Sequence, residues 1–409
     1  GDAIGAARRF LGADGPRRYL VALQNNAEMR DQGMVLSYAF LGADGGRLTA
    51  TRSGPIADLA LDRPIAQPVP PGMQQIFGGL APTRLWQSVN ATADFAWSGR
   101  AMAEMAQQAT GEAVDGVVAL DVPGLAALLG VVGPVTVPGI DTPVDAANAA
   151  DVLLNRLYAD FPRSRDQAER KERLGAVAEA VVARMTAGSF DAVTLGSELG
   201  SAAAAGHLRL WSADASEQAI FERTGLGGGP AAVAPERTVH VSVQNATATK
   251  LDYFVKPELE LRVAVTPSGT AVVDADVVVV NTAPPDARPS YQFGPDGVSQ
   301  DRAGQYVSRV YFWGPRGAEQ PDSVAESGLR LNQGPITVDP GQRGSVRFQT
   351  VIPGAVRGGR LDLRLVPQPR LAPIPLRATL TAPGWNVDGA ATRRLTWDRT
   401  LTVSWTLRR

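Results

Sequence analysis

The polar stretch at residues 24–30 carries the most chemistry in this sequence. Gln24-Asn25-Asn26-Ala27-Glu28-Met29-Arg30 supplies carboxamides, a carboxylate and a guanidinium directly after the apolar run Arg18–Leu23. Such a run is typical of a buried strand, and in open α/β sheets ligands bind beyond the carboxyl ends of the strands. We therefore predict that the two asparagines, Glu28 and Arg30 belong to a ligand site. An Asn-Asn pair followed by charges is also typical of an ordinary turn.

Three carboxylates near predicted strand ends or loops are candidates for acid–base chemistry: Glu28, Asp58 and Asp94. Glycoside hydrolysis needs two such groups, one acting as the acid and the other as nucleophile or base. The chain has 41 acidic residues, so many pairs arise by chance. The three residues remain catalytic candidates on position alone.

A second polar segment, Asn90–Phe95, lies between Trp86 and Trp97 and is followed by Arg100. It precedes a predicted helix, whose free N–H groups suit a phosphate or a sugar hydroxyl. Asn90, Asp94 and Arg100 are therefore candidate site residues. The alternative is that Asp94 or Ser98 only caps that helix.

A cluster of arginines begins another predicted helix: Arg163, Arg165, Arg170 and Arg173. The three-residue spacing puts the last two on one helix face. Guanidinium groups bind two oxygens at once, so Arg165, Arg170 and Arg173 are candidate receptors for a pyrophosphate or an acidic glycan. The alternative is a solvated helix face on which they pair with Asp166, Glu169 and Glu172.

Composition excludes several classes of chemistry. The net charge of −1 provides no global field toward nucleic acid or an anionic membrane. The chain has no cysteine and only two histidines, His207 and His240, which excludes disulfides, thiolate nucleophiles and Cys-based or multi-histidine metal sites. A divalent cation such as Mg²⁺ would need oxygen ligands. The sequence has no Walker loop, no dinucleotide-binding glycine motif, no nucleophile elbow and no His-Glu-x-x-His.

Alternating strand-like and helix-like segments predict a layered α/β domain over residues 1–234. Apolar or β-branched runs predict strands at Arg18–Gln24, Met34–Leu41, Arg47–Ser53, Gly116–Asp121 and His207–Trp211. Helical periodicity predicts helices at Ser98–Thr110, Pro123–Gly130, Asp145–Tyr158, Arg165–Ala187 and Ser216–Arg223. The Pro- and Gly-rich stretch Arg63–Gly79 is interpreted as a long loop of the kind that often covers a site.

Residues 235–409 are predicted to form an all-β, immunoglobulin-like antiparallel sandwich. The linker Gly225–Pro235 precedes it, and eight period-2 runs follow without any helical pattern. These runs are Thr238–Gln244, Glu258–Val265, Ala271–Val280, Gln305–Phe312, Ser345–Val351, Arg360–Val366, Leu376–Thr381 and Leu401–Leu407. Core packing is expected for Trp313, Trp385, Trp397 and Trp405, with a sugar-stacking platform as the alternative.

Several of these segments together resemble the bacterial domain of unknown function 4012 family. They are, in order, Tyr19–Arg30, Asn90–Phe95, Val114–Asp121, Gly133–Pro138, His207–Trp211 and the segment from Asn245 to Lys250-Leu251-Asp252-Tyr253-Phe254. The family pattern continues after its Asn-Asn-Ala-Glu-Leu-Arg with Pro-Thr, where this chain has Asp31 and Gln32. The resemblance implies a membrane-anchored, extracytoplasmic envelope protein associated with polysaccharides. Most of the basic residues are arginine rather than lysine, which agrees with a GC-rich bacterial genome, such as an actinobacterial one.

More distantly, the first half resembles the LytR-CpsA-Psr phosphotransferases, which move glycopolymers from a polyprenyl-pyrophosphate carrier. That resemblance implies an α/β/α fold, a Mg²⁺-binding role for Asp58 in Pro55-Ile56-Ala57-Asp58, and phosphate binding by Arg170 and Arg173. Ala57 stands where that family's pattern has an arginine, and Leu174 stands where it has a glutamine. Arg52 and Arg30 are candidates to bring a guanidinium group to the place of the missing arginine.

Three functions remain open on sequence alone. The first is a phosphotransferase-like enzyme acting on a lipid-linked envelope glycan, and the second is a glycoside hydrolase or transglycosylase that uses Glu28 and Asp94. The third is a non-catalytic glycan-binding scaffold. No nucleic-acid partner is expected. The chain starts at Gly1 without a signal peptide or a run of about 18 apolar residues, so we expect any membrane contact through a segment outside it.

Overall fold

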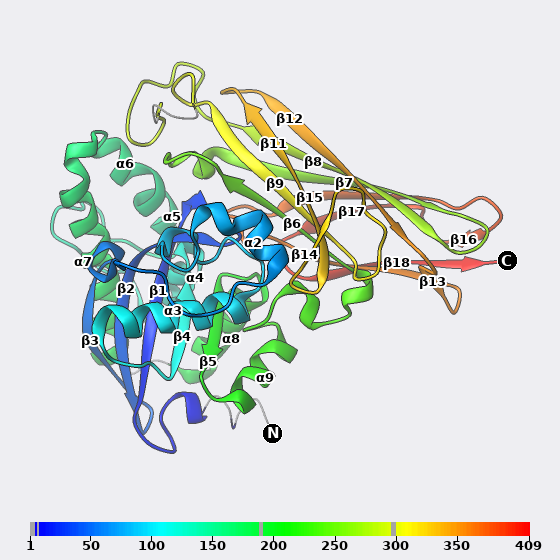
Figure 1. Cartoon of the computed structure of the whole chain (residues 1–409). Helices are drawn as coiled ribbons and strands as arrows, with labels where there is room; N and C mark the ends of the chain where they lie inside the picture. The colour runs from blue at the N-terminus through cyan, green and yellow to red at the C-terminus, as the bar shows by residue number, and fades with distance from the viewer. Residues whose placement is uncertain (1–4, 6–7, 188–190, 296–299) are drawn as a thin grey trace. The chain divides into compact units, whose positions relative to one another are not determined.

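The computed structural model describes residues 5, 8–187, 191–295 and 300–409. Contacts divide the chain into two compact units. The N-terminal unit consists of Gly1–Val69 and Met73–Gly229, and the C-terminal unit consists of Pro70–Gly72 and Pro230–Arg409. Helices and strands alternate in the first unit, whereas strands dominate the second (Figure 1).

The N-terminal unit is built on a five-stranded sheet of order β3-β2-β1-β4-β5. Its strands are β1 (Arg17–Met29), β2 (Gly33–Asp44), β3 (Arg47–Pro55), β4 (Gly116–Leu120) and β5 (Leu208–Ser212). Only β1 and β4 are parallel neighbours; the other pairs are antiparallel. Leu20, Val21 and Ala22 are all buried, because the central strand β1 is covered on both faces.

Helices cover both faces of this sheet (Figure 1). Leu20 and Ala22 of β1 share one hydrophobic cluster with Met102 of α3. On the opposite face of β3, Ser53 Oγ donates a hydrogen bond to Glu179 of α7 at 2.7 Å. The mixed, layered α/β character predicted for this region is therefore confirmed. The helices are α2 (Pro71–Phe77), α3 (Phe95–Thr110), α4 (Val122–Val132), α5 (Ala149–Asp151), α6 (Leu157–Asp160), α7 (Gln167–Ala187), α8 (Ala192–Ala204) and α9 (Ala215–Thr224).

Three sequence predictions in this unit need correction. The predicted loop 63–79 contains α2, and the helix predicted to begin at Asp145 begins at Ala149. The segment Val152–Arg156, between α5 and α6, is a π-helix. Helix α8 was not predicted, because its Ala-, Gly- and Ser-rich sequence has a weak apolar pattern. None of the helices in the described part of the chain is long and apolar enough to span a membrane.

The C-terminal unit contains two sheets that pack around one hydrophobic core. The larger has the order β10-β11-β9-β6-β14-β18-β16, with β13 paired to β14, and the smaller has the order β12-β8-β7-β15-β17. Their strands are β6 (Thr238–Asn245), β7 (Val255–Val265), β8 (Ala271–Asn281), β9 (Tyr306–Gly314), β10 (Val324–Glu326), β11 (Leu329–Val338), β12 (Arg343–Ile352), β13 (Val356–Arg357), β14 (Arg360–Val366), β15 (Ile374–Thr381), β16 (Asn386–Asp388), β17 (Thr392–Trp397) and β18 (Leu401–Arg408).

The prediction of a purely antiparallel sandwich is wrong in two places. β14 pairs with β6, and β15 pairs with β7, in parallel. β11 and β17 are also additional to the predicted strands: β11 contains Pro335 and β17 contains two adjacent arginines, features that weaken a strand pattern. Core packing of the tryptophans is confirmed for Trp313, Trp397 and Trp405, which are each at most 1% exposed.

Candidate functional site

Residues 24–29 of the polar stretch lie within strand β1 and only Arg30 follows it, which corrects the prediction that the strand ends at Gln24. Bulges interrupt the pairing of β1 with β2 between Leu23 and Gln24 and again between Asn25 and Met29. A bulge changes the direction in which side chains point without ending the strand, so the polar side chains continue along β1. Glu28 is only 6% exposed. A Cβ atom on Gly33 would lie 2.9–3.1 Å from backbone atoms of Asn25, so glycine permits this close approach.

The side chain of Asn26 joins the adjacent parallel strands β1 and β4. Its Nδ2 donates to Asp121 Oδ2 at 2.7 Å, and its Oδ1 accepts from the Val122 N–H at 3.1 Å. Asp121 directly follows β4 and caps α4 by accepting from the Gly124 N–H at 3.0 Å. The asparagine therefore fixes the start of α4 against the carboxyl end of β1.

His207 completes this arrangement, which we call the Asp121 network (Asn26, Asp121 and His207). Its Nδ1 lies 2.7 Å from Asp121 Oδ2, and its side chain is 14% exposed whereas that of Asp121 is 1% exposed. Burial opposes protonation of the imidazole, but the adjacent carboxylate outweighs it and raises the pKa of His207 above the usual 6.5. The network is thus an oriented acid–base pair at the carboxyl ends of two parallel strands.

Asn25 reaches a different helix from the same strand. Its Nδ2 donates to the Tyr158 hydroxyl at 2.8 Å, and its Oδ1 accepts from the Ala27 N–H at 2.9 Å. The Arg170 guanidinium carbon lies 5.1 Å from the centre of the Tyr158 ring. Arg170 is 2% exposed and also donates to the Phe161 carbonyl. It therefore belongs neither to a solvent-facing anion receptor nor to a solvated helix face, the two interpretations made from the sequence.

Asn90 connects the second polar segment to the loop that follows β1. Its Nδ2 donates to the Gly33 carbonyl at 2.8 Å, and its backbone carbonyl accepts from the Asp31 N–H at 3.2 Å. Asp94 caps α3 by accepting from the Ala96 and Trp97 N–H groups at 3.1 and 3.4 Å, which confirms the capping alternative. Burial raises the pKa of Asp94, and these two hydrogen bonds oppose that rise.

Arg52 and Asp58 lie near the side chain of Tyr38, and we call these three residues the Tyr38 cluster. The Arg52 guanidinium carbon lies 5.6 Å from the centre of the Tyr38 ring. Burial raises the pKa of Tyr38, the charge of Arg52 lowers it, and the charge of Asp58 raises it again. A Cβ atom on Gly54 would lie 2.7 Å from Asp58 Oδ2 and 3.4 Å from the Tyr38 hydroxyl oxygen. Arg52 and Asp58 are themselves exposed.

The remaining predicted arginines do not share one set of contacts. Arg100 pairs with Glu104 at 3.3 Å, and Arg165 lies 3.9 Å from Asp166 with 72% of its side chain exposed. Arg173 pairs with Glu169 at 2.6 Å and donates to the Gly139 carbonyl. Arg30 is half-buried, and its Nη1 lies 3.5 Å from the Met29 carbonyl oxygen. Arg165 does not share these contacts, whereas Arg170 and Arg173 both contact Phe161. Anion binding by the Arg165–Arg173 cluster stays a prediction.

No group of three or more His, Asp or Glu residues in the described part of the chain is arranged to hold a metal ion. Asp58 lies close enough to Tyr38 and Arg52 for both charges to act on the tyrosine, and within the described residues it belongs to no cluster of three acidic or histidine side chains. A protein-built Mg²⁺ site normally requires one or two carboxylates together with other oxygen donors. These surroundings do not fit the Mg²⁺-holding role predicted for Asp58, and no chemical step is assigned to a metal here.

The sequence interpretation omitted three residues that organise this region: Asp121, His207 and Tyr158. Two signals were available. Asp121 stands between a β-branched run and a Pro-Gly helix start, a position typical of a helix cap, and His207 is one of only two histidines. Tyr158 gave no such signal, because only the fold brings it to Asn25, 133 positions away in the chain.

Residues 14–158 match the model of DUF4012, a family described as protein of unknown function. This part of the chain is similar to the DUF4012 family. The matched region contains β1 to β4, the asparagines and the Tyr38 cluster, whereas His207 and residues 230–409 lie outside it. The family resemblance found in the sequence is therefore confirmed.

Comparisons with other proteins add little to this assignment. No curated protein sequence matches the chain. A solved structure described as a transcriptional regulator from Bacillus subtilis is similar at 10% identity and a TM-score of 0.26, over 52% of this chain and 77% of that one. A putative nutrient binding protein from Legionella pneumophila is similar at 10% identity and a TM-score of 0.23, over 41% and 70%. Scores this low establish neither a shared fold nor a function.

Proposed function

We propose that the N-terminal unit is an extracytoplasmic, phosphotransferase-like enzyme for a lipid-linked envelope glycan, with the Tyr38 cluster as its anion-binding site. One observation carries the proposal. An exposed guanidinium and an exposed carboxylate both lie near the side chain of Tyr38, and the carboxylate stands just beyond the carboxyl end of β3.

The resemblance to the LytR-CpsA-Psr phosphotransferases supports this choice of site. Asp58 stands at the position of the aspartate in that family's Pro-Arg-Asp motif, and Ala57 removes the motif's arginine. Arg52 is close enough to influence the same tyrosine that Asp58 influences, so its guanidinium replaces the missing charge in space. A positioned cation stabilises the charge on a transferring phosphoryl group. In this proposal Arg52 binds the phosphoryl oxygens and Asp58 accepts the proton of the acceptor hydroxyl. The acceptor oxygen then bonds to the phosphorus that carries the sugar, and the bond from that phosphorus to the bridging oxygen breaks, releasing the polyprenyl phosphate.

The test is binding and turnover of a short-chain polyprenyl pyrophosphate that carries a disaccharide. Arg52→Gln should weaken binding about 10–100-fold, because hydrogen bonds to a charged group contribute about 1.5–3 kcal/mol. Asp58→Asn should abolish transfer with little change in binding. Arg47→Gln is the matched control, because Arg47 is an exposed arginine at the other end of the same strand. Equal binding by all three variants would refute the proposal.

Glycoside hydrolysis by Glu28 and Asp94 remains a second candidate, because burial raises the pKa of Asp94. A general acid in a glycosidase needs such a shift to stay protonated near neutral pH. This candidate predicts release of sugar from a wall polysaccharide in the presence of a chelator, and loss of that release in Glu28→Gln. If neither activity is found and a glycan still binds, the chain is a scaffold.

A further inference from the structure

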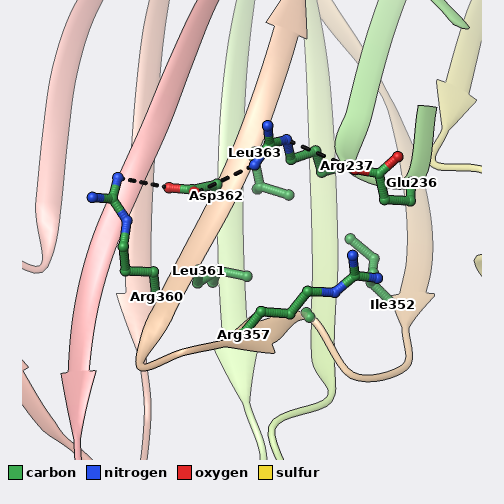
Figure 2. Close-up of a pocket in the computed structure, with 9 residues that line it drawn as sticks. Glu236, Arg237, Ile352, Arg357, Arg360, Leu361, Asp362 and Leu363 are labelled. Atoms are coloured by element: carbon green, nitrogen blue, oxygen red, sulfur yellow. Dashed lines mark hydrogen bonds and ion pairs between the residues drawn. The ribbon is translucent and has the colours of Figure 1, made fainter. Parts of the chain in front are cut away.

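A hollow of about 60 Å³ lies in the C-terminal unit. It has room for a few water molecules, or for one tetrahedral oxyanion. Aliphatic side chains and five charged ones line it (Figure 2). The lining residues are Glu236, Arg237, Ile352, Ala355, Arg357, Arg360, Leu361, Asp362 and Leu363. Three arginines and two carboxylates give the hollow a formal charge of +1.

Two of the three arginines already share a carboxylate. Asp362 accepts from Arg360 Nη2 at 3.2 Å, and Arg237 Nη1 lies 3.5 Å from its other oxygen. Ser404 Oγ donates to Asp362 at 2.6 Å. Burial would raise the pKa of Asp362, but the serine and arginine contacts outweigh burial and lower it. Asp362 therefore remains an anion, and its negative charge pairs with both Arg237 and Arg360.

Arg357 is the cation without such a partner. Among the described residues it forms no ion pair, and its Nε lies 3.4 Å from the Gly354 carbonyl oxygen. Figure 2 shows its side chain extending toward Ile352, away from Asp362. The hollow thus holds a guanidinium whose charge is not balanced within the unit.

The backbone holds Arg357 directly opposite another arginine. Arg357 and Arg360 are cross-strand partners of β13 and β14, joined by Gly358 and Gly359 with φ of 56° and 73°. Positive φ at both turn positions is what a tight hairpin requires, so the facing pair is fixed. Like charges that face each other across a strand pair are destabilising. Figure 2 shows the two side chains diverging, Arg360 toward Asp362 and Arg357 toward Ile352, so Arg357 is the arginine whose charge remains for a bound anion.

A facing arginine pair alone does not define a site. Arg377 and Arg394 are also cross-strand partners, on β15 and β17, and neither lines the hollow. At Arg357 and Arg360, in contrast, a facing pair borders a concavity of oxyanion size. We propose that this hollow binds one phosphate-sized oxyanion, held by Arg357 over the aliphatic floor, either free or as a phosphate group within an anionic polymer.

The test uses the full chain and titrates inorganic phosphate while its ³¹P NMR signal and the thermal unfolding midpoint are followed. Saturable binding with a dissociation constant in the millimolar range is expected for so few contacts. Arg357→Gln should weaken it about 5-fold or more, and Arg357→Lys, which keeps the charge, should weaken it less. The control Arg377→Gln removes the same like-charge repulsion without touching the hollow, so it should leave binding unchanged.

Two results would overturn the inference: no saturable binding by the unmodified chain, or equal binding by Arg357→Gln when circular dichroism shows it folded. Arg52→Gln should retain phosphate binding at the hollow, so failure of the enzymatic proposal and failure of this one can be told apart. A short glycerol-phosphate oligomer identifies the source of the anion. Tighter binding of the oligomer than of free phosphate, lost in Arg357→Gln, assigns a polymer, and equal binding assigns free phosphate.

Discussion

Each unit contains a buried aspartate that several polar groups contact, Asp121 in the N-terminal unit and Asp252 in the C-terminal unit. The two aspartates differ in the charged side chain that faces them. In the C-terminal unit, Asp252 accepts from the Tyr306 hydroxyl at 2.8 Å, from Arg370 at 3.0 Å and from Asn245 at 3.0 Å. The side chains of Asp252 and Arg370 are 0% and 3% exposed. The carboxylate is balanced by an arginine, whose charge is permanent, so the arrangement is closed.

In the N-terminal unit, Asp121 instead faces His207, a group that gains and loses its proton in the physiological range. The histidine is also more exposed than any of the three partners of Asp252. Buried polar groups at strand ends therefore have two distinct roles in this chain. The Asp252 arrangement holds the sandwich together, whereas the Asp121 network can also exchange a proton.

The largest expected effect comes from breaking the closed arrangement. Asp252→Ala should lower the free energy of unfolding of the C-terminal unit by about 3–5 kcal/mol, because it leaves the buried Arg370 charge without its carboxylate. Calorimetry can follow this transition. Asp388→Ala is the control, because its carboxylate is 59% exposed and pairs with Arg408 at the surface. If Asp252→Ala lowers the free energy of unfolding by less than about 1 kcal/mol, the Arg370 charge is solvated. The Asp252 arrangement would then not be closed, and the contrast with the Asp121 network would fail.

An intermediate effect is expected at His207, and it should depend on pH. The folded pKa is raised, so the stabilisation is complete below the unfolded value of about 6.5 and declines as pH rises through the folded pKa. The N-terminal unit should therefore be more stable at pH 6 than at pH 9. His207→Gln should cost about 1.5–3 kcal/mol at pH 6 and less at pH 9, because it removes a hydrogen bond between charged groups.

Urea unfolding of both proteins across this pH range measures the difference. The C-terminal unit should show no change that depends on His207. An equal loss of stability at pH 6 and pH 9 would mean that the imidazole contributes packing only, and the contrast between the two aspartates would then disappear.

The sequence predicted the layers better than the contacts, for a physical reason. Period and composition report burial, so the apolar run Arg18–Leu23 and the β-branched runs of the sandwich identified their strands correctly. Where β1 ends was set by its pairing with β2 through two bulges, which no local pattern encodes. Arginine spacing predicted a shared helix face, but the aromatic rings of Tyr158 and Phe161 and the Gly139 carbonyl, brought there by folding, determine what Arg170 and Arg173 contact.

The smallest effect is expected at Asp94, and it separates a cap from a catalytic acid. Asp94→Ala should cost about 1 kcal/mol, because α3 loses the acceptor for two backbone N–H groups. Asp94→Asn keeps an oxygen that caps almost as well but cannot donate an acidic proton, so its stability should match that of the unmodified chain. If Asp94 is only a cap, any activity of the chain should survive in Asp94→Asn. If that variant is stable and inactive, Asp94 acts as an acid, and the raised pKa of a buried carboxylate then favours glycoside hydrolysis over phosphoryl transfer.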